Sequence, residues 1–172
     1  MPTSTMEVAS TWMARSGFVE DSFYRLSNKF LSDAYSLAIR NKNESGPYKR
    51  DLNMAISSDN GRQYWQIKKI SDTNDRYWFA CRFLGKDVRL AVDPSDMINP
   101  LMAEADNTAI GQQWNVKRIA DRWSISNVLW DSEAQLSTYS DWYELFMDME
   151  DDLGTVWSIA HVRKITAADD FL

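Results

Sequence analysis

The residues best suited to contact a ligand lie in one short segment of the last third of the chain. Asp141 stands between Tyr139 and the pair Trp142 and Tyr143, and Phe146 follows three residues later. A carboxylate accepts charge-assisted hydrogen bonds, and an aromatic ring offers a flat apolar face. We therefore predict a ligand-binding site at Tyr139, Asp141, Trp142, Tyr143 and Phe146. The alternative interpretation is that Trp142 and Tyr143 close the end of the fold or cover a hydrophobic edge.

Side chains for nucleophilic or metal chemistry are few. The chain has one histidine, His161, and one cysteine, Cys81. One His with one Cys does not make a zinc site, and no paired nucleophile completes a catalytic triad. The acidic run at residues 148–152 lacks the spacing and glycine of a calcium loop, so a solvated turn is the favoured interpretation. We predict no metal and no cofactor, and the sequence identifies no catalytic residue.

The charge pattern argues against a nucleic-acid partner. The formal net charge is −6, and acidic and basic residues alternate without forming a basic stripe. Basic residues do recur just after three of the tryptophans, at Lys68, Lys69, Lys117, Arg118, Arg163 and Lys164. Three solvated strand ends explain this recurrence, with a composite anion site as the alternative.

Length and the lack of recognisable targeting signals predict one domain without a secretory signal or a membrane span. A chain of 172 residues is long enough to bury a core of its own. The first 15 residues contain no apolar run of signal-peptide length, and no segment has the roughly 18 apolar residues of a membrane span. Cys81 is alone and cannot form an intramolecular disulfide, and its aromatic neighbours predict a buried thiol. We expect a cytoplasmic protein without a membrane partner, or one exported without a signal peptide.

Three tryptophans recur in matching contexts along the chain. Trp65 lies in a Gln-Tyr-Trp sequence, Trp114 in Gln-Gln-Trp, and Trp157 in Thr-Val-Trp, with separations of 49 and 43 residues. Each is followed by alternating apolar residues, which is typical of a strand. A period of this size predicts one supersecondary unit made three times.

Hydrophobic alternation predicts four short strands in each unit. Before each tryptophan strand, three apolar stretches are expected, at residues 23–26, 35–39 and 52–56, then 76–83, 88–92 and 101–105, then 122–128, 134–139 and 143–147. Turn signals separate them, among them Asn60-Gly61, Asp93-Pro94-Ser95 and Asn99-Pro100.

The predicted organisation is an N-terminal extension at 1–20, repeats at about 21–70, 71–119 and 120–165, and a C-terminal tail at 166–172. Met6, Val8, Trp12 and Met13 could form a helical face that plugs a barrel end or packs on its side.

Three units of four strands, with Gln-x-Trp or its remnant on the last strand, resemble the ricin B-type β-trefoil family over residues 20–165. The resemblance implies an all-β trefoil fold and carbohydrate binding, as in cytosolic lectins of fungi. It also implies that Trp65, Trp114 and Trp157 pack in the core and do not contact ligand. Sugar pockets of this family need an aspartate on the second strand of a repeat and an aromatic ring on the third.

Carried over by position, these family ligands are mostly replaced in this chain. The aspartate falls near Ala38, Ala91 and Ser137, and the aromatic ring near Ala55, Ala103 and Phe146. The resemblance therefore favours a nonstandard sugar site, and the third repeat, with Asp141 and its aromatic neighbours, is the best candidate.

Three functions compete. The first is a non-enzymatic lectin-like module that binds a glycan. The second is a cofactor-free cyclase or isomerase that encloses a small hydrophobic molecule in an aromatic-lined pocket of several hundred Å3. The third is a protease inhibitor that presents the long loop at residues 41–51. A homodimer is a further possible assembly.

Overall fold

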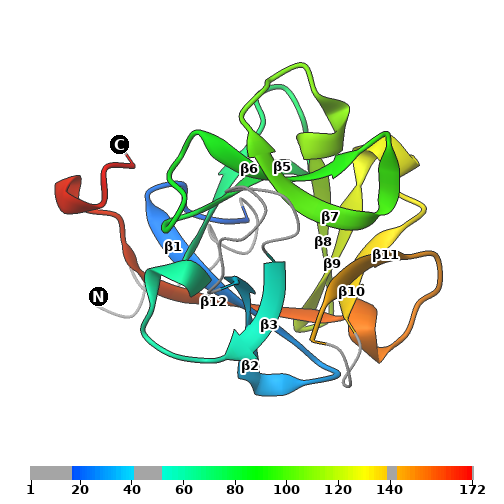
Figure 1. Ribbon diagram of the computed structural model, residues 1–172, viewed down its shortest axis with the longest axis horizontal. Coiled ribbons are helices and arrows are strands. Elements are labelled where there is room, and N and C mark those ends of the chain that lie inside the picture. The colour runs from blue at the N-terminus through cyan, green and yellow to red at the C-terminus, as the bar shows by residue number, and fades with distance from the viewer. Residues whose placement is uncertain (1–16, 41–51, 139–142, 172) are drawn as a thin grey trace, which may run out of the picture.

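The computed structural model describes residues 17–40, 52–138 and 143–171, which form an all-β structure (Figure 1). Twelve strands occur in these ranges: β1 Ser22–Asn28, β2 Ser32–Ile39, β3 Leu52–Ile56, β4 Trp65–Lys69, β5 Arg76–Cys81, β6 Val88–Asp93, β7 Asp96–Glu104, β8 Trp114–Ile119, β9 Arg122–Asn127, β10 Gln135–Thr138, β11 Leu145–Asp148 and β12 Trp157–Lys164. Five single turns of 3₁₀ helix connect them: η1 Gly61–Gln63, η2 Ile110–Gln112, η3 Val128–Trp130, η4 Leu153–Thr155 and η5 Ala167–Asp169. In this part of the chain, no helix has the length and apolarity that crossing a membrane requires.

Six strands pair in a closed ring. Strand β1 pairs with β12 and β4, β5 pairs with β4 and β8, and β9 pairs with β8 and β12. Closure leaves these strands without a free edge, which removes a template for aggregation. The other six strands form the hairpins β2–β3, β6–β7 and β10–β11, which lie at the bottom, top and right of Figure 1.

The three repeated tryptophans fill the centre of this barrel. Trp65, Trp114 and Trp157 are 0% exposed, and each begins the strand that follows a 3₁₀ turn. Each indole Nε1 donates to a leucine carbonyl on the hairpin that precedes it in sequence, at 3.0 Å to Leu37, 3.0 Å to Leu90 and 2.8 Å to Leu136. A buried N–H without a partner costs about 1–3 kcal/mol, so these bonds fix the position of each hairpin over the barrel.

The strands differ from the sequence prediction at two places. Asn99-Pro100 was expected to turn, but β7 continues through it. Pro100 lies between Asp96 and Leu101, the residues that pair with β6, where the ladder is irregular and no N–H of proline is required. Tyr143 was expected to begin a strand, but its φ of 53° is left-handed and β11 begins two residues later.

Phe18 plugs the open end of the barrel. Its ring centroid lies 5.2 Å from Tyr24, 5.6 Å from Tyr77 and 4.8 Å from Trp123. These three aromatic residues are equivalent in position, because each pairs across the ring with one of the repeated tryptophans. Gly17 leads into the plug with a φ of +81°, and a Cβ there would overlap the Tyr77 hydroxyl. The helical plug predicted from Met6, Val8, Trp12 and Met13 lies outside the described residues.

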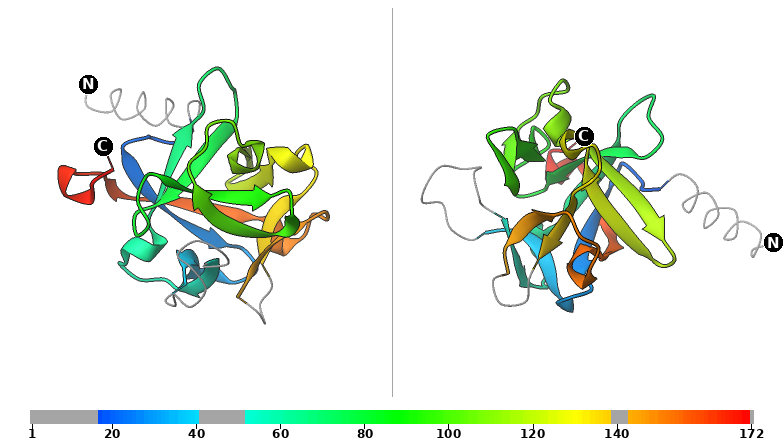
Figure 2. Two further views of the ribbon diagram at one scale, coloured as in Figure 1. Left: turned by 45° about the horizontal axis from the view of Figure 1, so that its top comes forward. Right: turned by 90° about the vertical axis from the view of Figure 1, so that its right-hand side faces the viewer.

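The C-terminal segment packs back on the outside of the barrel, beside β1 (Figure 2). Phe171 packs edge to face on Phe23 with ring centroids 5.2 Å apart. Asp169 is the anchor, because its carboxylate accepts two hydrogen bonds of 2.8 Å from Arg163 and one of 2.6 Å from Arg82. These guanidinium groups, with the Thr166 backbone N–H, hold the pKa of Asp169 well below its ordinary value.

Replacing the plug should lower stability strongly. We expect Phe18→Ala to lower the free energy of unfolding by about 3 kcal/mol, because it removes a buried ring and leaves a cavity among three aromatic side chains. Phe30→Ala is the matched control, because Phe30 is 42% exposed, and it should cost less than about 1 kcal/mol. Urea denaturation measures both, and equal losses for the two variants would show that Phe18 does not plug a core.

Candidate functional site

The aromatic segment predicted as the ligand site is described only in part. Tyr139, Asp141 and Trp142 lie outside the described residues. Tyr143 stacks on Tyr35 of β2 with ring centroids 4.9 Å apart, and its carbonyl accepts a 2.7 Å hydrogen bond from the Met54 backbone N–H. Tyr143 therefore connects the β10–β11 hairpin with the β2–β3 hairpin.

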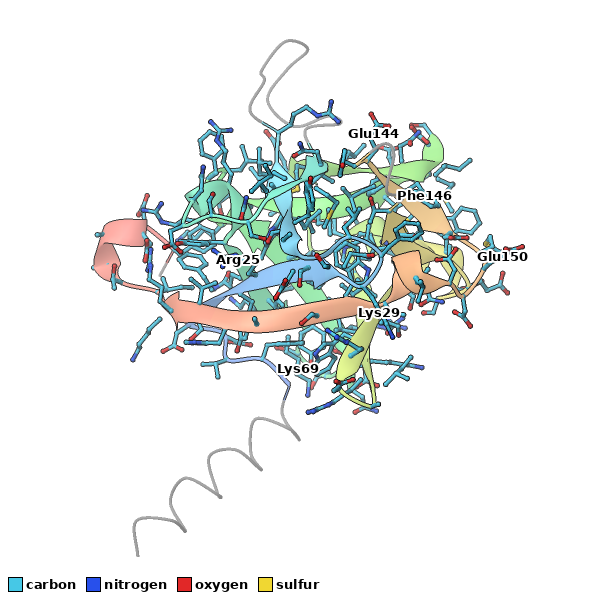
Figure 3. The ribbon with its side chains drawn as sticks, turned by 90° about the horizontal axis from the view of Figure 1, so that it is seen from below. Arg25, Lys29, Lys69, Glu144, Phe146 and Glu150 are labelled. Carbon is cyan, nitrogen blue, oxygen red and sulfur yellow. The ribbon has the colours of Figure 1, made fainter. Side chains whose placement is uncertain are left out.

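Phe146 lies in β11, opposite Ser137 of β10, and is half-buried. Figure 3 shows its ring at the periphery of the molecule, on the same side as Glu150. The structure thus places Tyr143 against β2 and Phe146 on the β10–β11 hairpin, each in a different environment.

The positions that carry sugar ligands in the resembled family are closed in this chain. Ala38, Ala91 and Ser137 each follow a leucine that accepts the indole hydrogen bond, so the three are equivalent, and all are buried. Strand register also refines the expected aromatic position. Phe146 faces Ser137, so its equivalents are Asn53 and Leu101, the partners of Ala38 and Ala91. Ala55 and Ala103, the positions expected from the sequence, each lie two residues further along their strands.

The glutamine before each tryptophan has a structural role. The Gln63 amide donates to the Ile56 carbonyl at 2.7 Å and accepts from the Ser58 N–H at 3.0 Å. Gln112 makes the same pair of bonds, to the Glu104 carbonyl at 2.7 Å and from the Asp106 N–H at 2.9 Å. Both amides are buried and occupied by backbone, so neither is available to support a ligand carboxylate. At the third position, Thr155 bonds within its own 3₁₀ turn instead.

A groove of about 640 Å3 opens between the tip of the β8–β9 hairpin and the turn that precedes β12. This volume lies within the roughly 300–1,000 Å3 of pockets that hold small ligands. Its walls come from segments distant in sequence: residues 119–124 of the hairpin, residues 151–156 around η4, Gln135 at the start of β10, and Lys29 after β1. Figure 3 shows Lys29 near this hairpin.

Trp123 is the aromatic side chain of the groove. It is half-buried, because its ring contacts the Phe18 plug on one side while it also lines the groove. Ile119 and Leu153 add apolar surface and are 63% and 53% exposed. A flat indole flanked by apolar side chains suits the C–H face of a sugar or another ring-shaped ligand.

Charged and amide side chains also line the groove: the carboxylates of Asp121, Asp151 and Asp152, the cations Lys29 and Arg122, and the Gln135 amide. Asp151 accepts a hydrogen bond from the Gln135 amide, which holds both side chains at the groove. Asp152 caps η4, where its Oδ1 accepts from the Gly154 N–H at 2.9 Å. Burial, with the neighbouring Asp148 carboxyl, raises the pKa of Asp152. Both carboxylates are exposed: Asp151 lies beside the Gln135 amide, and Asp152 caps the turn.

A smaller pocket of about 150 Å3 lies at the cap of the barrel. Arg40 and Glu144 line it and form an ion pair of 3.6 Å, with Asn99 and Pro100 on the opposite hairpin. The exposed ion pair is worth little in free energy. This pocket has no aromatic wall among its lining residues, which makes it a poorer ligand site than the groove.

Cys81 and the acidic run offer no reactive centre among the described residues. Burial raises the pKa of the Cys81 thiol to about 12, and its Sγ donates to the carbonyls of Gly61 and Arg62 at 3.3 and 3.4 Å. A neutral buried thiol is a poor nucleophile. No group of three or more His, Cys, Asp or Glu side chains in this part of the chain is arranged to hold a metal ion.

The groove residues were not identified from the sequence as a site. Trp123 was assigned to a strand and the acidic run to a solvated turn. One signal was available: the two later units open with Asp-Arg followed by an aromatic residue, at Tyr77 and Trp123, and only the latter unit also has an acidic run before its last strand.

Comparison with known proteins shows a fold and no close relative. No protein-family model matches the chain, and no curated protein matches it significantly. Among solved structures, the designed three-fold symmetric protein ThreeFoil is similar with a TM-score of 0.65 at 15% identity, over 81% of this chain and 99% of that one. The BEL β-trefoil is similar with a TM-score of 0.64 at 12% identity, over 84% of this chain and 96% of that one.

A lectin of Polyporus squamosus, solved with the saccharide epitope Neu5Aca2-6Galb1-4GlcNAc, has a TM-score of 0.62 at 15% identity. The match covers 83% of this chain and 50% of the lectin, so this chain spans about half the length of that protein. These likenesses show that the all-β chain has a β-trefoil fold, as predicted.

The structural role of the glutamines can be tested on neighbouring residues. We expect Gln112→Ala to lower the free energy of unfolding by about 1–3 kcal/mol, because it leaves a backbone carbonyl and N–H without their partner. Gln113→Ala is the control, because that amide accepts only a long 3.4 Å bond from Arg76 at the surface, and it should cost less than about 0.5 kcal/mol. Urea midpoints report both variants. A similar loss at both positions would contradict the assigned role.

Proposed function

We propose that this protein is a non-enzymatic, lectin-like module and that the groove beside Trp123 binds its carbohydrate ligand. The observation that carries the proposal is the combination, in one groove of about 640 Å3, of an indole wall with an exposed carboxylate and an amide. The similar fold of a saccharide-bound lectin supports the ligand class and not the position of the site.

The chemistry of a sugar fits this combination. Adjacent hydroxyl groups donate hydrogen bonds, and Asp151 presents a carboxylate that accepts them with the strength of a charge-assisted bond. Gln135, bonded to Asp151, keeps that carboxylate in place and offers further polar atoms. Trp123 supports the apolar face of the ring. Such a site binds a ligand by surface complementarity and needs no cofactor.

The proposal includes a division into three repeats and membership of the ricin B-type group. Support comes from the three equivalent indole bonds and from the two equivalent glutamine bridges, at Gln63 and Gln112. In that division the groove belongs chiefly to the third repeat, where a nonstandard sugar site was predicted. The cytoplasmic location stays a prediction.

The two other predicted functions gain less support. A cyclase or isomerase of the predicted kind needs an enclosed pocket with several aromatic walls, whereas the barrel centre is filled by Trp65, Trp114 and Trp157. The groove offers one aromatic ring and is open to solvent. The inhibitor loop at residues 41–51 lies outside the described residues, so that function stays a prediction.

A glycan array with purified variants tests the proposal. We expect the wild-type protein to bind a limited set of glycans, and Asp151→Asn to weaken that binding by about 10- to 100-fold through loss of charge-assisted bonds. Trp123→Phe should weaken it by up to about 10-fold while keeping an aromatic contact with Phe18. Glu133→Gln, an exposed substitution outside the groove, is the control and should bind as the wild type does.

Two further variants locate the site. Asp141→Ala and Trp142→Ala test the segment predicted from the sequence on the same array. Loss of binding in these two variants, with the groove variants unaffected, would place the sugar site in that segment and contradict the groove. Absence of any glycan binding by the folded wild-type protein would contradict the function itself.

A further inference from the structure

A third pocket, of about 160 Å3, lies over β4, β5 and the start of β6. Gln66 and Lys68 come from β4, Trp78 and Ala80 from β5, and Arg89 from β6, while Lys86 and Asp87 lie just before β6 and Phe171 comes from the C-terminal segment. In the barrel ring, β4 and β5 stand opposite β9 and β12. The pocket is therefore separate from the groove and independent of the proposed function.

Basic side chains dominate this pocket, although the whole chain is acidic. Three cations line it, Lys68, Lys86 and Arg89, against the single carboxylate of Asp87. Like charges gathered around one small cavity repel each other, and the repulsion is stronger beside low-dielectric walls such as the rings of Trp78 and Phe171. An anion in the pocket would lower this electrostatic free energy.

The Arg89 side chain is fixed by two contacts, one with an aromatic ring and one with an amide. Its Cζ lies 3.8 Å from the centroid of the Trp78 ring, and its NH1 donates a 2.9 Å hydrogen bond to the Asn107 side chain. Burial lowers the pKa of Arg89, opposed by the charges of Asp106 and Asp87. The Asp106 Oδ1 already accepts two hydrogen bonds from Thr108, at 2.9 and 2.7 Å. A guanidinium fixed by stacking keeps its other N–H groups in a planar array, which matches an oxyanion.

Trp78, which lines the same pocket, has an unsatisfied indole donor. Its Nε1 is buried and has no hydrogen-bond partner among the described residues. The three core indoles at Trp65, Trp114 and Trp157 all have one. A buried N–H without an acceptor costs about 1–3 kcal/mol, so Trp78 differs from the core tryptophans in carrying an unsatisfied donor in a residue that lines a pocket.

The pocket and the groove use corresponding positions of two units. Trp78 follows Tyr77 as Ser124 follows Trp123, and both tyrosine and tryptophan pair across the ring with a core tryptophan. Arg89 precedes Leu90 as Gln135 precedes Leu136, and both leucines accept the indole bond. The equivalent position therefore carries a neutral amide in one unit and a stacked cation in another.

We propose that this pocket binds one sulfate or phosphate group, either as the free ion or as an ester on a larger molecule. The cavity is smaller than the roughly 300 Å3 at which pockets hold whole small-molecule ligands, so it suits a single charged group. Lys68 and Lys86 supply charge, and Arg89 supplies directed hydrogen bonds.

NMR titration of the ¹⁵N-labelled full chain tests this site. Sodium sulfate, sodium phosphate and galactose 6-sulfate are added separately at constant ionic strength, with sodium chloride as the reference salt. We expect saturable shifts of the Trp78 indole N–H and the Arg89 Nε–H with the free ions. Saturation of the same two resonances by galactose 6-sulfate assigns an esterified group as ligand, and saturation by the free ions alone assigns the free ion.

Variants that remove a charge distinguish specific anion binding in the pocket from a general effect of salt on the spectrum. Lys68→Met and Arg89→Gln should each weaken sulfate binding at least 10-fold. Lys117→Met is the matched control, because Lys117 follows Trp114 by the same three residues as Lys68 follows Trp65, and it should leave binding unchanged. Shifts that grow linearly and match those in chloride, or that survive Lys68→Met and Arg89→Gln unchanged, would overturn the proposal.

Discussion

The rest of the structure depends on one buried hydrogen bond made three times. Each core indole donates its N–H to a leucine carbonyl on the neighbouring hairpin, at 2.8 to 3.0 Å. The ring fills the barrel while the bond fixes the hairpin, so one side chain specifies both the core and its cap. The hairpin has little freedom to move, because a shift would leave the buried indole N–H without its acceptor. Phe18 completes the arrangement by closing the other end against Tyr24, Tyr77 and Trp123.

Because the tryptophans specify the core and its cap, the side chains at other strand positions can differ between the three units. The position before each leucine acceptor is Ser36 in the first unit, Arg89 in the second and Gln135 in the third. The three residues face different surroundings: Ser36 bonds Ser57, Arg89 stacks on Trp78, and Gln135 bonds Asp151. Equivalent backbone positions thus carry different side chains in the three units.

The fold could be predicted from the sequence because its signal is local and repeated. Trp65, Trp114 and Trp157 recur with strand alternation, and each recurrence supports the others. The groove could not be predicted, because Lys29, Trp123 and Asp151 meet only after β12 pairs with β1 and β9 and closes the ring. Backbone exceptions were missed for a related reason. Pro100 continues a strand because it lies where the β6–β7 ladder is irregular, and the carbonyl of the left-handed Tyr143 accepts a hydrogen bond from Met54 of the neighbouring hairpin.

The central claim is that the core tryptophans hold the fold while Trp123 contacts ligand. Indole N–H resonances of the ¹⁵N-labelled protein, followed during titration with a glycan selected on the array, test it most directly. The account predicts that the Trp123 indole and the Gln135 side-chain amide shift and saturate together, while the indoles of Trp65, Trp114 and Trp157 stay in place. Saturable shifts of those three indoles, with Trp123 unmoved, would contradict it.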